Sequence, residues 1–198
     1  MRENERELIE KAKEGDSQAF DELFLSQQKY LFNLMYQLCG DIAKADDLTQ
    51  EAFILAYKKL LDFRCESSFR TWLSRIALNL FRKECRAKFK NGHYEGIEEI
   101  QIPSDGDCPE RTVYKSELQW CIVHMLSHLP KKYRIILVLR DLHNISYREI
   151  ADIMKWNVGQ VRINLYRARR LFKKELIKGA CKAFADNYLC ICQGILEL

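Results

Sequence analysis

Residues 146–174, "SYREIADIMKWNVGQVRINLYRARRLFKK", carry the pattern that decides the predicted fold. Ser146 is followed three residues later by Glu149, which is the capping-box spacing that opens a helix. The helical pattern ends at "KWN", and Asn157 with Gln160 repeats the same spacing at the start of a second helix. Two short helices joined by a tight turn predict a helix-turn-helix motif.

The second predicted helix has two different faces. An apolar stripe at helical spacing is expected to pack on the preceding helices, and it consists of Val161, Leu165, Ala168 and Phe172. A polar and basic stripe lies beside it, and it consists of Arg162, Tyr166, Arg169 and Lys173. Arginine, amide and phenol side chains can bind base edges and phosphates. A basic helix face that is only solvated is the alternative, but the two caps and the short turn favour DNA binding.

The composition agrees with a folded, mostly helical chain. Of its 198 residues, 30% are charged and 47% hydrophobic, with only 3 prolines and 8 glycines. Residues 64–90 hold eight Lys and Arg against two Glu, and residues 157–178 hold seven against one. Between them, residues 91–111 hold six acids and one arginine. Two basic surfaces for a polyanion, joined by a segment that avoids it, are therefore predicted.

Periodicity predicts an all-α fold of two small helical domains joined by a flexible linker. In the first domain, residues 5–40 form two helices that separate near residues 15–17. Two further helices are expected at 41–63 and 67–90, and the fourth has Phe69, Leu73, Ile76 and Leu80 at helical spacing. The pattern then stops and resumes near residue 113. The predicted divisions are 5–90, the linker 91–112, 113–178, and a C-terminal tail 179–198.

Eight cysteines raise the question of disulfides, but the first residues are too charged for a signal peptide and no apolar run reaches membrane-spanning length. We therefore expect a cytoplasmic protein with reduced thiols and no membrane insertion. In the tail, Cys181, Cys190 and Cys192 are interpreted as buried thiols, with a soft-metal or regulatory site as the alternative. His124 and His128 could share a metal, but surface or interhelical packing is favoured.

Two longer stretches resemble a known family. Residues 126–176, "LSHLPKKYRIILVLRDLHNISYREIADIMKWNVGQVRINLYRARRLFKKEL", resemble region 4 of bacterial RNA polymerase sigma factors of the extracytoplasmic-function (ECF) group. Residues 46–83, "DDLTQEAFILAYKKLLDFRCESSFRTWLSRIALNLFRK", resemble region 2 of the same group. The likeness covers most of residues 5–178, with both regions in the expected order.

The resemblance implies a transcription initiation factor that binds core RNA polymerase and directs it to specific promoters. Region 2 would bind the polymerase clamp through a docking helix that contains Asp46, Asp47, Gln50, Glu51 and Phe53. It would also recognise and melt the downstream (minus-10) element, holding the non-template single strand with Phe63, Arg64, Cys65, Glu66, Ser67, Ser68, Arg70, Trp72, Arg75 and Asn79. Region 4 would read the upstream (minus-35) element of double-stranded DNA with Gln160, Arg162, Ile163, Asn164, Tyr166, Arg167 and Arg170.

Some positions depart from the family pattern. Gln160, Ile163 and Asn164 replace the usual Thr, Ser and Arg, and Cys65 and Glu66 stand where Gly and Asp are common. These changes affect which promoter sequence is expected.

Two other classes of function fit the sequence less well. A stand-alone helix-turn-helix regulator would need neither the second basic segment nor the docking helix. A nucleic-acid enzyme would need a convergent catalytic set, and no catalytic residue, cofactor or metal is expected. An anti-sigma partner is expected by analogy with the family.

Overall fold

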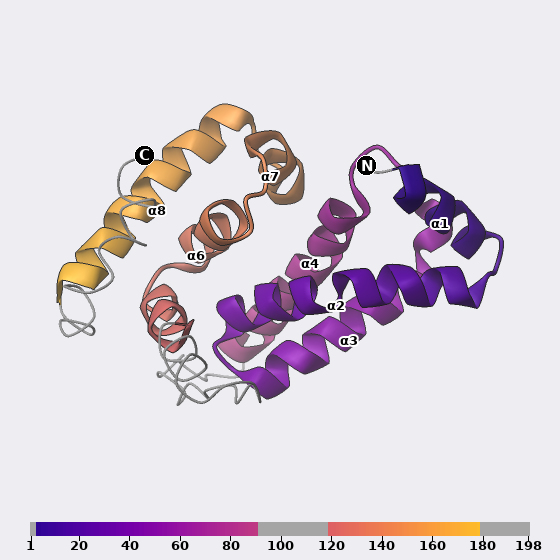
Figure 1. Cartoon of the computed structure of the whole chain (residues 1–198). Helices are drawn as coiled ribbons and strands as arrows, with labels where there is room; N and C mark the ends of the chain where they lie inside the picture. The colour runs from indigo at the N-terminus through magenta and orange to yellow at the C-terminus, as the bar shows by residue number, and fades with distance from the viewer. Residues whose placement is uncertain (1–2, 91–118, 179–198) are drawn as a thin grey trace, which may run out of the picture. The chain divides into compact units, whose positions relative to one another are not determined.

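The computed structural model describes residues 3–90 and 119–178 (Figure 1). All regular structure in these two ranges is helical, which confirms the predicted all-α class. The chain divides into two compact units, one containing residues 1–36 and 43–96 and the other residues 37–42 and 97–198. The predicted linker 91–112 and the tail 179–198, with its three cysteines, lie outside the described residues.

In its described residues the first unit contains four α-helices and one 3-10 turn, except that the last three residues of α2 and the first residue of α3 fall in the second unit. Their bounds are α1 Glu3–Lys13, α2 Ser17–Cys39, α3 Ile42–Lys58, η1 Leu60–Asp62 and α4 Phe69–Lys90. The chain turns between α1 and α2 at Gly15, whose φ of +98° suits a residue without a Cβ. Asp16 caps α2, because its Oδ1 accepts hydrogen bonds from the amides of Gln18 and Ala19 at 2.9 and 3.2 Å.

Apolar side chains at helical spacing form the core of this unit. Phe69 is 1% exposed, and Leu73 is fully buried, as the α4 periodicity predicts. Leu31 and Leu34 of α2 are likewise fully buried. Burying each such side chain stabilises the unit by about 1.5–3 kcal/mol, so the stripe on α4 is what holds this helix in the bundle.

The second unit contains helical residues 119–127, then α6 Lys131–Leu137, a π-helical segment η2 Val138–Leu142, α7 Tyr147–Met154 and α8 Val158–Lys178. Pro130 precedes α6, and its carbonyl accepts the amides of Tyr133 and Arg134 at 2.8 and 3.1 Å. The sequence predicts a regular helix over 130–142. The last five residues instead form a wider turn, in which the amide of His143 donates to the carbonyl of Val138.

Both predicted capping boxes of the helix-turn-helix are present. Ser146 Oγ accepts the amide of Glu149 at 3.3 Å, and the Glu149 carboxylate accepts the amide of Ser146 at 3.1 Å. Lys155 ends α7 in the left-handed conformation, with φ 56° and ψ 46°. Asn157 Oδ1 then accepts the amide of Gln160 at 2.7 Å, and Gln160 Oε1 accepts the amide of Asn157 at 2.9 Å. These local bonds fix where each helix begins.

Candidate nucleic-acid and polymerase interface

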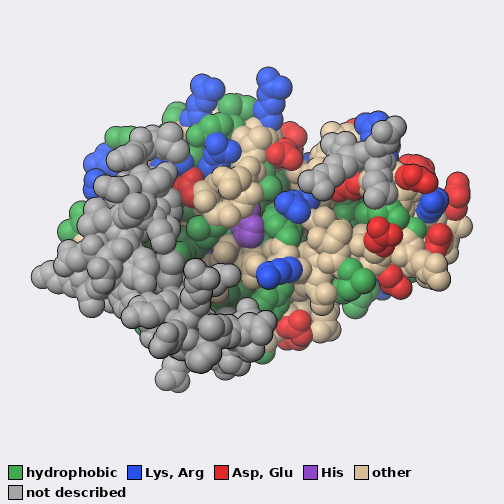
Figure 2. All heavy atoms as spheres, in the orientation of Figure 1, with side chains coloured by type: hydrophobic (Ala, Val, Ile, Leu, Met, Phe, Trp, Pro, Cys, Tyr) green, Lys and Arg blue, Asp and Glu red, His purple; other side chains and the backbone are tan. Residues whose placement is uncertain are grey.

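Helix α8 is packed through one face and open on the other. Its predicted apolar stripe is buried, with Val161 at 0% and Leu165 at 2% exposed, and the helix packs on α6 and α7. Figure 2 shows Lys and Arg side chains gathered over α7 and α8. Six of the residues predicted to read the upstream element are exposed: Gln160, Arg162, Ile163, Tyr166, Arg167 and Arg170. The open face of α8 therefore combines cationic and apolar groups.

Two of the predicted readers, Gln160 and Asn164, make hydrogen bonds within the helix itself. Gln160 Oε1 accepts a hydrogen bond from the Asn157 amide, as part of the second capping box. Asn164 donates from Nδ2 to the carbonyl of Gln160 at 2.8 Å. Each side chain thus makes a bond that stabilises the first turns of α8, which leaves fewer of its atoms for a base edge.

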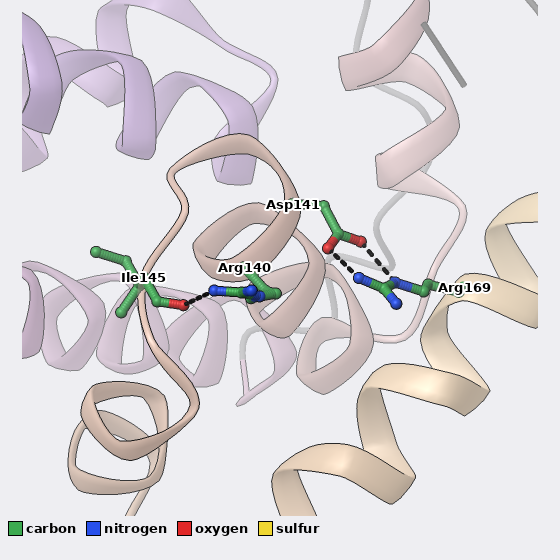
Figure 3. A network of polar contacts seen from close by, with 4 residues as sticks. All are labelled: Arg140, Asp141, Ile145 and Arg169. Atoms are coloured by element: carbon green, nitrogen blue, oxygen red, sulfur yellow. Dashed lines mark hydrogen bonds and ion pairs between the residues drawn. The ribbon is translucent and has the colours of Figure 1, made fainter. Parts of the chain in front are cut away.

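Arg169 does not join the open face, which corrects the basic stripe expected from the sequence. Its guanidinium donates from Nε and Nη2 to the two carboxylate oxygens of Asp141, at 3.1 and 2.7 Å (Figure 3). The two side chains are 14% and 6% exposed. The hydrogen bond from Arg169 to Asp141 raises the pKa of Arg169 above its ordinary value, against the lowering effect of burial.

Arg140, the residue before Asp141, makes further contacts in the same region. Arg140 donates from Nη1 to the carbonyl of Ile145 at 3.1 Å (Figure 3), and its guanidinium lies 4.9 Å from the ring centroid of Tyr147. The contacts of Arg140 therefore fix the segment between η2 and α7 against η2, and the ion pair of Asp141 with Arg169 fixes α8 against η2. Together these bonds position the recognition helix on its scaffold.

The predicted docking helix, α3, presents four of its five assigned side chains to solvent: Asp46, Asp47, Gln50 and Glu51. Gln50 donates to Asp46 at 2.8 Å. The structure places the fifth, Phe53, inside the unit at 3% exposed, with its ring 4.0 Å from that of Phe24 on α2. Phe53 therefore supports α3 from within instead of offering a surface to a partner. A groove of about 450 Å³ lies beside these residues, between α2 and α3.

The loop at residues 63–68, predicted to help hold the non-template single strand, has a buried first residue. Phe63 is 3% exposed and packs on Trp72 with ring centroids 4.9 Å apart. Arg64 and Glu66 are exposed, whereas Cys65, Ser67 and Ser68 are half-buried. Cys65 adopts a φ of +57°, a left-handed conformation that suits a glycine better than a residue with a Cβ.

Ser68 has a local role within the same loop. Its Oγ accepts the amide of Thr71 at 3.1 Å, which caps the start of α4. Ser67 Oγ lies 3.4 Å from the carbonyl of Ser68. The hydroxyl of Ser68 is thus part of what fixes the loop, and Arg64 and Glu66 are its freest side chains.

The predicted strand-binding residues of α4 lie in different surroundings. Arg70 donates from Nε to Gln27 Oε1 at 3.0 Å, and its guanidinium lies 4.5 Å from the ring centroid of Tyr30. Arg75 is half-buried, and its Nε has no hydrogen-bond partner in the unit. Trp72 is half-buried and Asn79 is exposed. The sequence did not indicate Gln27 or Tyr30, since their contacts with Arg70 join positions 43 and 40 residues apart.

His124 and His128 make ring contacts with their neighbours. The His124 ring stacks on Trp120 with centroids 5.1 Å apart, and His128 meets His124 edge-on at 4.8 Å. Burial and the nearby His128 lower the pKa of His124. No group of three or more His, Cys, Asp or Glu side chains suited to a metal occurs in residues 3–90 and 119–178. Within the same ranges, no helix is long and apolar enough to span a membrane.

Comparison with known proteins identifies both units. A family profile described as "Sigma-70 region 2" matches residues 23–89, and one described as "Sigma-70, region 4" matches residues 119–172. The RNA polymerase sigma-H factor of Pseudomonas aeruginosa is 34% identical over 182 residues, covering 88% of this chain and 94% of that protein. The ECF RNA polymerase sigma factor SigW of Bacillus subtilis is 34% identical over 179 residues, covering 86% and 96%.

A solved structure shares the fold. CnrH, in complex with the cytosolic domain of CnrY, matches with a TM-score of 0.70 at 23% identity, covering 90% of this chain and 100% of that one. The chain belongs to the sigma-70 family of RNA polymerase sigma factors, within the ECF group. As a sigma factor, it directs promoter-specific initiation of transcription, a family role that is not enzymatic.

Proposed function

We propose that the two units of this sigma factor divide promoter recognition between them. The region 2 unit, within residues 5–90, docks on the clamp of core RNA polymerase and opens the downstream element. The region 4 unit, within residues 113–178, reads the upstream element as double-stranded DNA. The observation that carries this proposal is α8, a helix with a capping box at its N-terminus, a buried apolar face and an open cationic face. We place this activity in the cytoplasm, with no catalytic step and no cofactor.

Helix α8 is suited to the major groove because exposed polar and basic side chains follow its open face from its first turns onward. In a helix-turn-helix, the first residues of the second helix contact base edges. Arg162, in the first turns of α8, and Arg167, near its middle, are exposed and can each donate two hydrogen bonds to a guanine. Arg170 and Lys173 lie further along and are suited to phosphates. Base reading and backbone binding are thus separated along one helix.

Docking on polymerase is assigned to the exposed polar face of α3. Asp46, Asp47, Gln50 and Glu51 form a continuous surface of carboxylates and one amide. Such a surface suits a partner with cationic side chains, and exposed charges of this kind raise the rate and specificity of association. Phe53 contributes indirectly, by holding α3 against α2 through Phe24.

Opening of the downstream element is assigned to the loop at 63–68 and the start of α4. Extruding a base costs a few kcal/mol, which protein contacts to the separated strand must offset. Arg64 is exposed on the loop, and Arg75 is partly exposed on α4. These groups can hold the non-template strand, and binding energy alone then shifts the equilibrium toward open DNA.

Reconstitution tests the division of labour. The full chain is mixed with core polymerase, and binding to polymerase is measured separately from binding of the holoenzyme to a promoter. Changing Asp47 and Glu51 to Ala should weaken the first binding, whereas changing Arg162 and Arg167 to Ala should weaken only the second. If both pairs weaken the same step, the proposed division is wrong. Glu14→Ala, just after α1, serves as the control for loss of an exposed acid.

We also propose an anti-sigma partner, by analogy with the family. The solved CnrH structure is a complex with the cytosolic domain of CnrY. A pull-down with the full chain as bait, repeated with core polymerase in excess, would show whether a bound inhibitor competes with polymerase.

A further inference from the structure

Ile163 occupies the outermost ridge of α8. Val161 and Leu165 face the interior of the unit, at 0% and 2% exposed. Ile163 lies two positions from each of them, and successive residues of an α-helix are rotated by about 100°. It therefore points to the opposite side, where it is 54% exposed. Tyr166, at 63% exposed, and Arg170 follow on the same ridge at helical spacing.

The residues around Ile163 leave its side chain accessible to a binding partner. Gly159, one turn earlier on the same ridge, has no side chain. Gln160 Oε1 accepts the amide of Asn157 in the cap of α8. Asn164 Nδ2 donates to the Gln160 carbonyl at 2.8 Å. Ile163 is thus the first unengaged side chain along this ridge, and it offers only methyl and methylene groups.

The positive charge around Ile163 indicates which kind of partner this surface favours. Exposed guanidinium groups border it, from Arg162, Arg167 and Arg170. Such a border is unfavourable for a cationic partner and favours a polyanion. Duplex DNA is the polyanion that also presents an apolar group beside its phosphates, because thymine projects its 5-methyl group into the major groove. The mixed surface of α8 therefore matches a thymine-containing major groove.

We infer that Ile163 contacts the 5-methyl group of a thymine, so that the upstream element carries thymine at the position facing this residue. The inference rests on the proposed reading of DNA by α8 and adds a base identity to it. The exposed ring of Tyr166 extends the apolar surface, and the guanidinium of Arg170 lies 5.9 Å from its centroid.

Replacing thymine by deoxyuridine tests the contact, since this removes the methyl group and keeps the base pair. An upstream element is first selected by run-off transcription from a promoter library randomised in that region, with the full chain and core polymerase. Each thymine of the selected element is then replaced singly, and holoenzyme binding is measured. One replacement should weaken binding about three- to fivefold, the effect of losing one buried methyl contact.

Variants at two isoleucines of α8 locate the contact. Ile163→Val keeps a branched apolar side chain and should retain the deoxyuridine effect. Ile163→Ser should abolish it, whereas Ile177→Ser, at another exposed isoleucine of the same helix, should retain it. The inference is overturned if deoxyuridine weakens binding of the Ile163→Ser variant as much as binding of the wild type. It is also overturned if no thymine replacement weakens binding of the wild type. Either result leaves the proposed function intact. Failure to obtain any specific transcript instead overturns the proposed function, and the inference with it.

Discussion

The guanidinium of Arg169 on α8 donates two hydrogen bonds to the carboxylate of Asp141 in η2, at 2.7 and 3.1 Å. Both side chains are largely buried, at 14% and 6% exposed. A paired geometry of this kind fixes direction as well as distance, because the planar fork of arginine matches the two carboxylate oxygens. The pair therefore sets how α8 lies on the segment before it, and it removes one arginine from the surface available to DNA.

Asp141→Ala should lower the free energy of unfolding by about 3 kcal/mol, because it leaves the Arg169 charge buried and unpaired. The matched control is Asp152→Ala, at an exposed aspartate of α7, which should change stability by less than about 0.5 kcal/mol. Urea denaturation of the full chain, followed by circular dichroism, measures both. Equal losses in the two variants would show that the buried pair contributes nothing beyond a surface charge.

Asn157→Ala should destabilise the chain by about 1 kcal/mol, since the amide of Gln160 loses its side-chain acceptor at the start of α8. Asn157→Asp keeps an acceptor oxygen and places a negative charge at a helix N-terminus, so it should be close to wild type in stability. Thermal denaturation of the two variants side by side checks this. A wild-type melting temperature for Asn157→Ala would argue that the cap is dispensable.

Cys65 lies in the left-handed region, with φ of +57°, where a Cβ is unfavourable. Cys65→Gly should therefore be more stable than Cys65→Ala by about 1 kcal/mol, the reverse of the order expected in a helix. Both variants lack the thiol, so the comparison isolates the backbone effect. Urea denaturation midpoints give the difference, and an alanine variant as stable as the glycine variant would contradict the strained geometry.

Acidification should destabilise the second unit through His124. Burial and His128 lower the pKa of His124 below its ordinary value of 6.5, so the unfolded chain takes up the proton more readily than the folded one. The stabilising contribution is present above pH 6.5 and is lost as the pH falls through the lowered pKa of the folded state. His124→Gln should flatten the stability profile between neutral and mildly acidic pH. Unfolding curves at several pH values check this, and an unchanged slope in the variant would assign the titration elsewhere.

The features that the sequence predicted well are local ones. Ser146 with Glu149, and Asn157 with Gln160, form their caps within one helical turn, so the residue spacing alone indicates the hydrogen bonds. The buried stripe of α8 follows in the same way from helical periodicity. Family likeness added the identity of the two units, which neither charge nor spacing could supply.

What the sequence could not predict depends on distant contacts and backbone angles. Arg169 has the spacing of an exposed residue, and only Asp141, 28 positions away, turns it inward. Phe53 belongs to the predicted docking helix with Asp46 and Gln50, and only its packing against Phe24, on another helix, shows that its side chain is buried. The positive φ of Cys65 likewise could not be predicted from the residue, since cysteine itself has no preference for that conformation.

Run-off transcription with purified core polymerase tests the sigma assignment most directly. A template pool is transcribed with core polymerase alone, with the full chain added, and with the Arg162→Ala, Arg167→Ala double variant added. We expect discrete transcripts from a small set of start sites with the full chain only, and binding of the double variant to polymerase without those transcripts. A chain that neither binds core polymerase nor produces a specific start site would contradict the assignment.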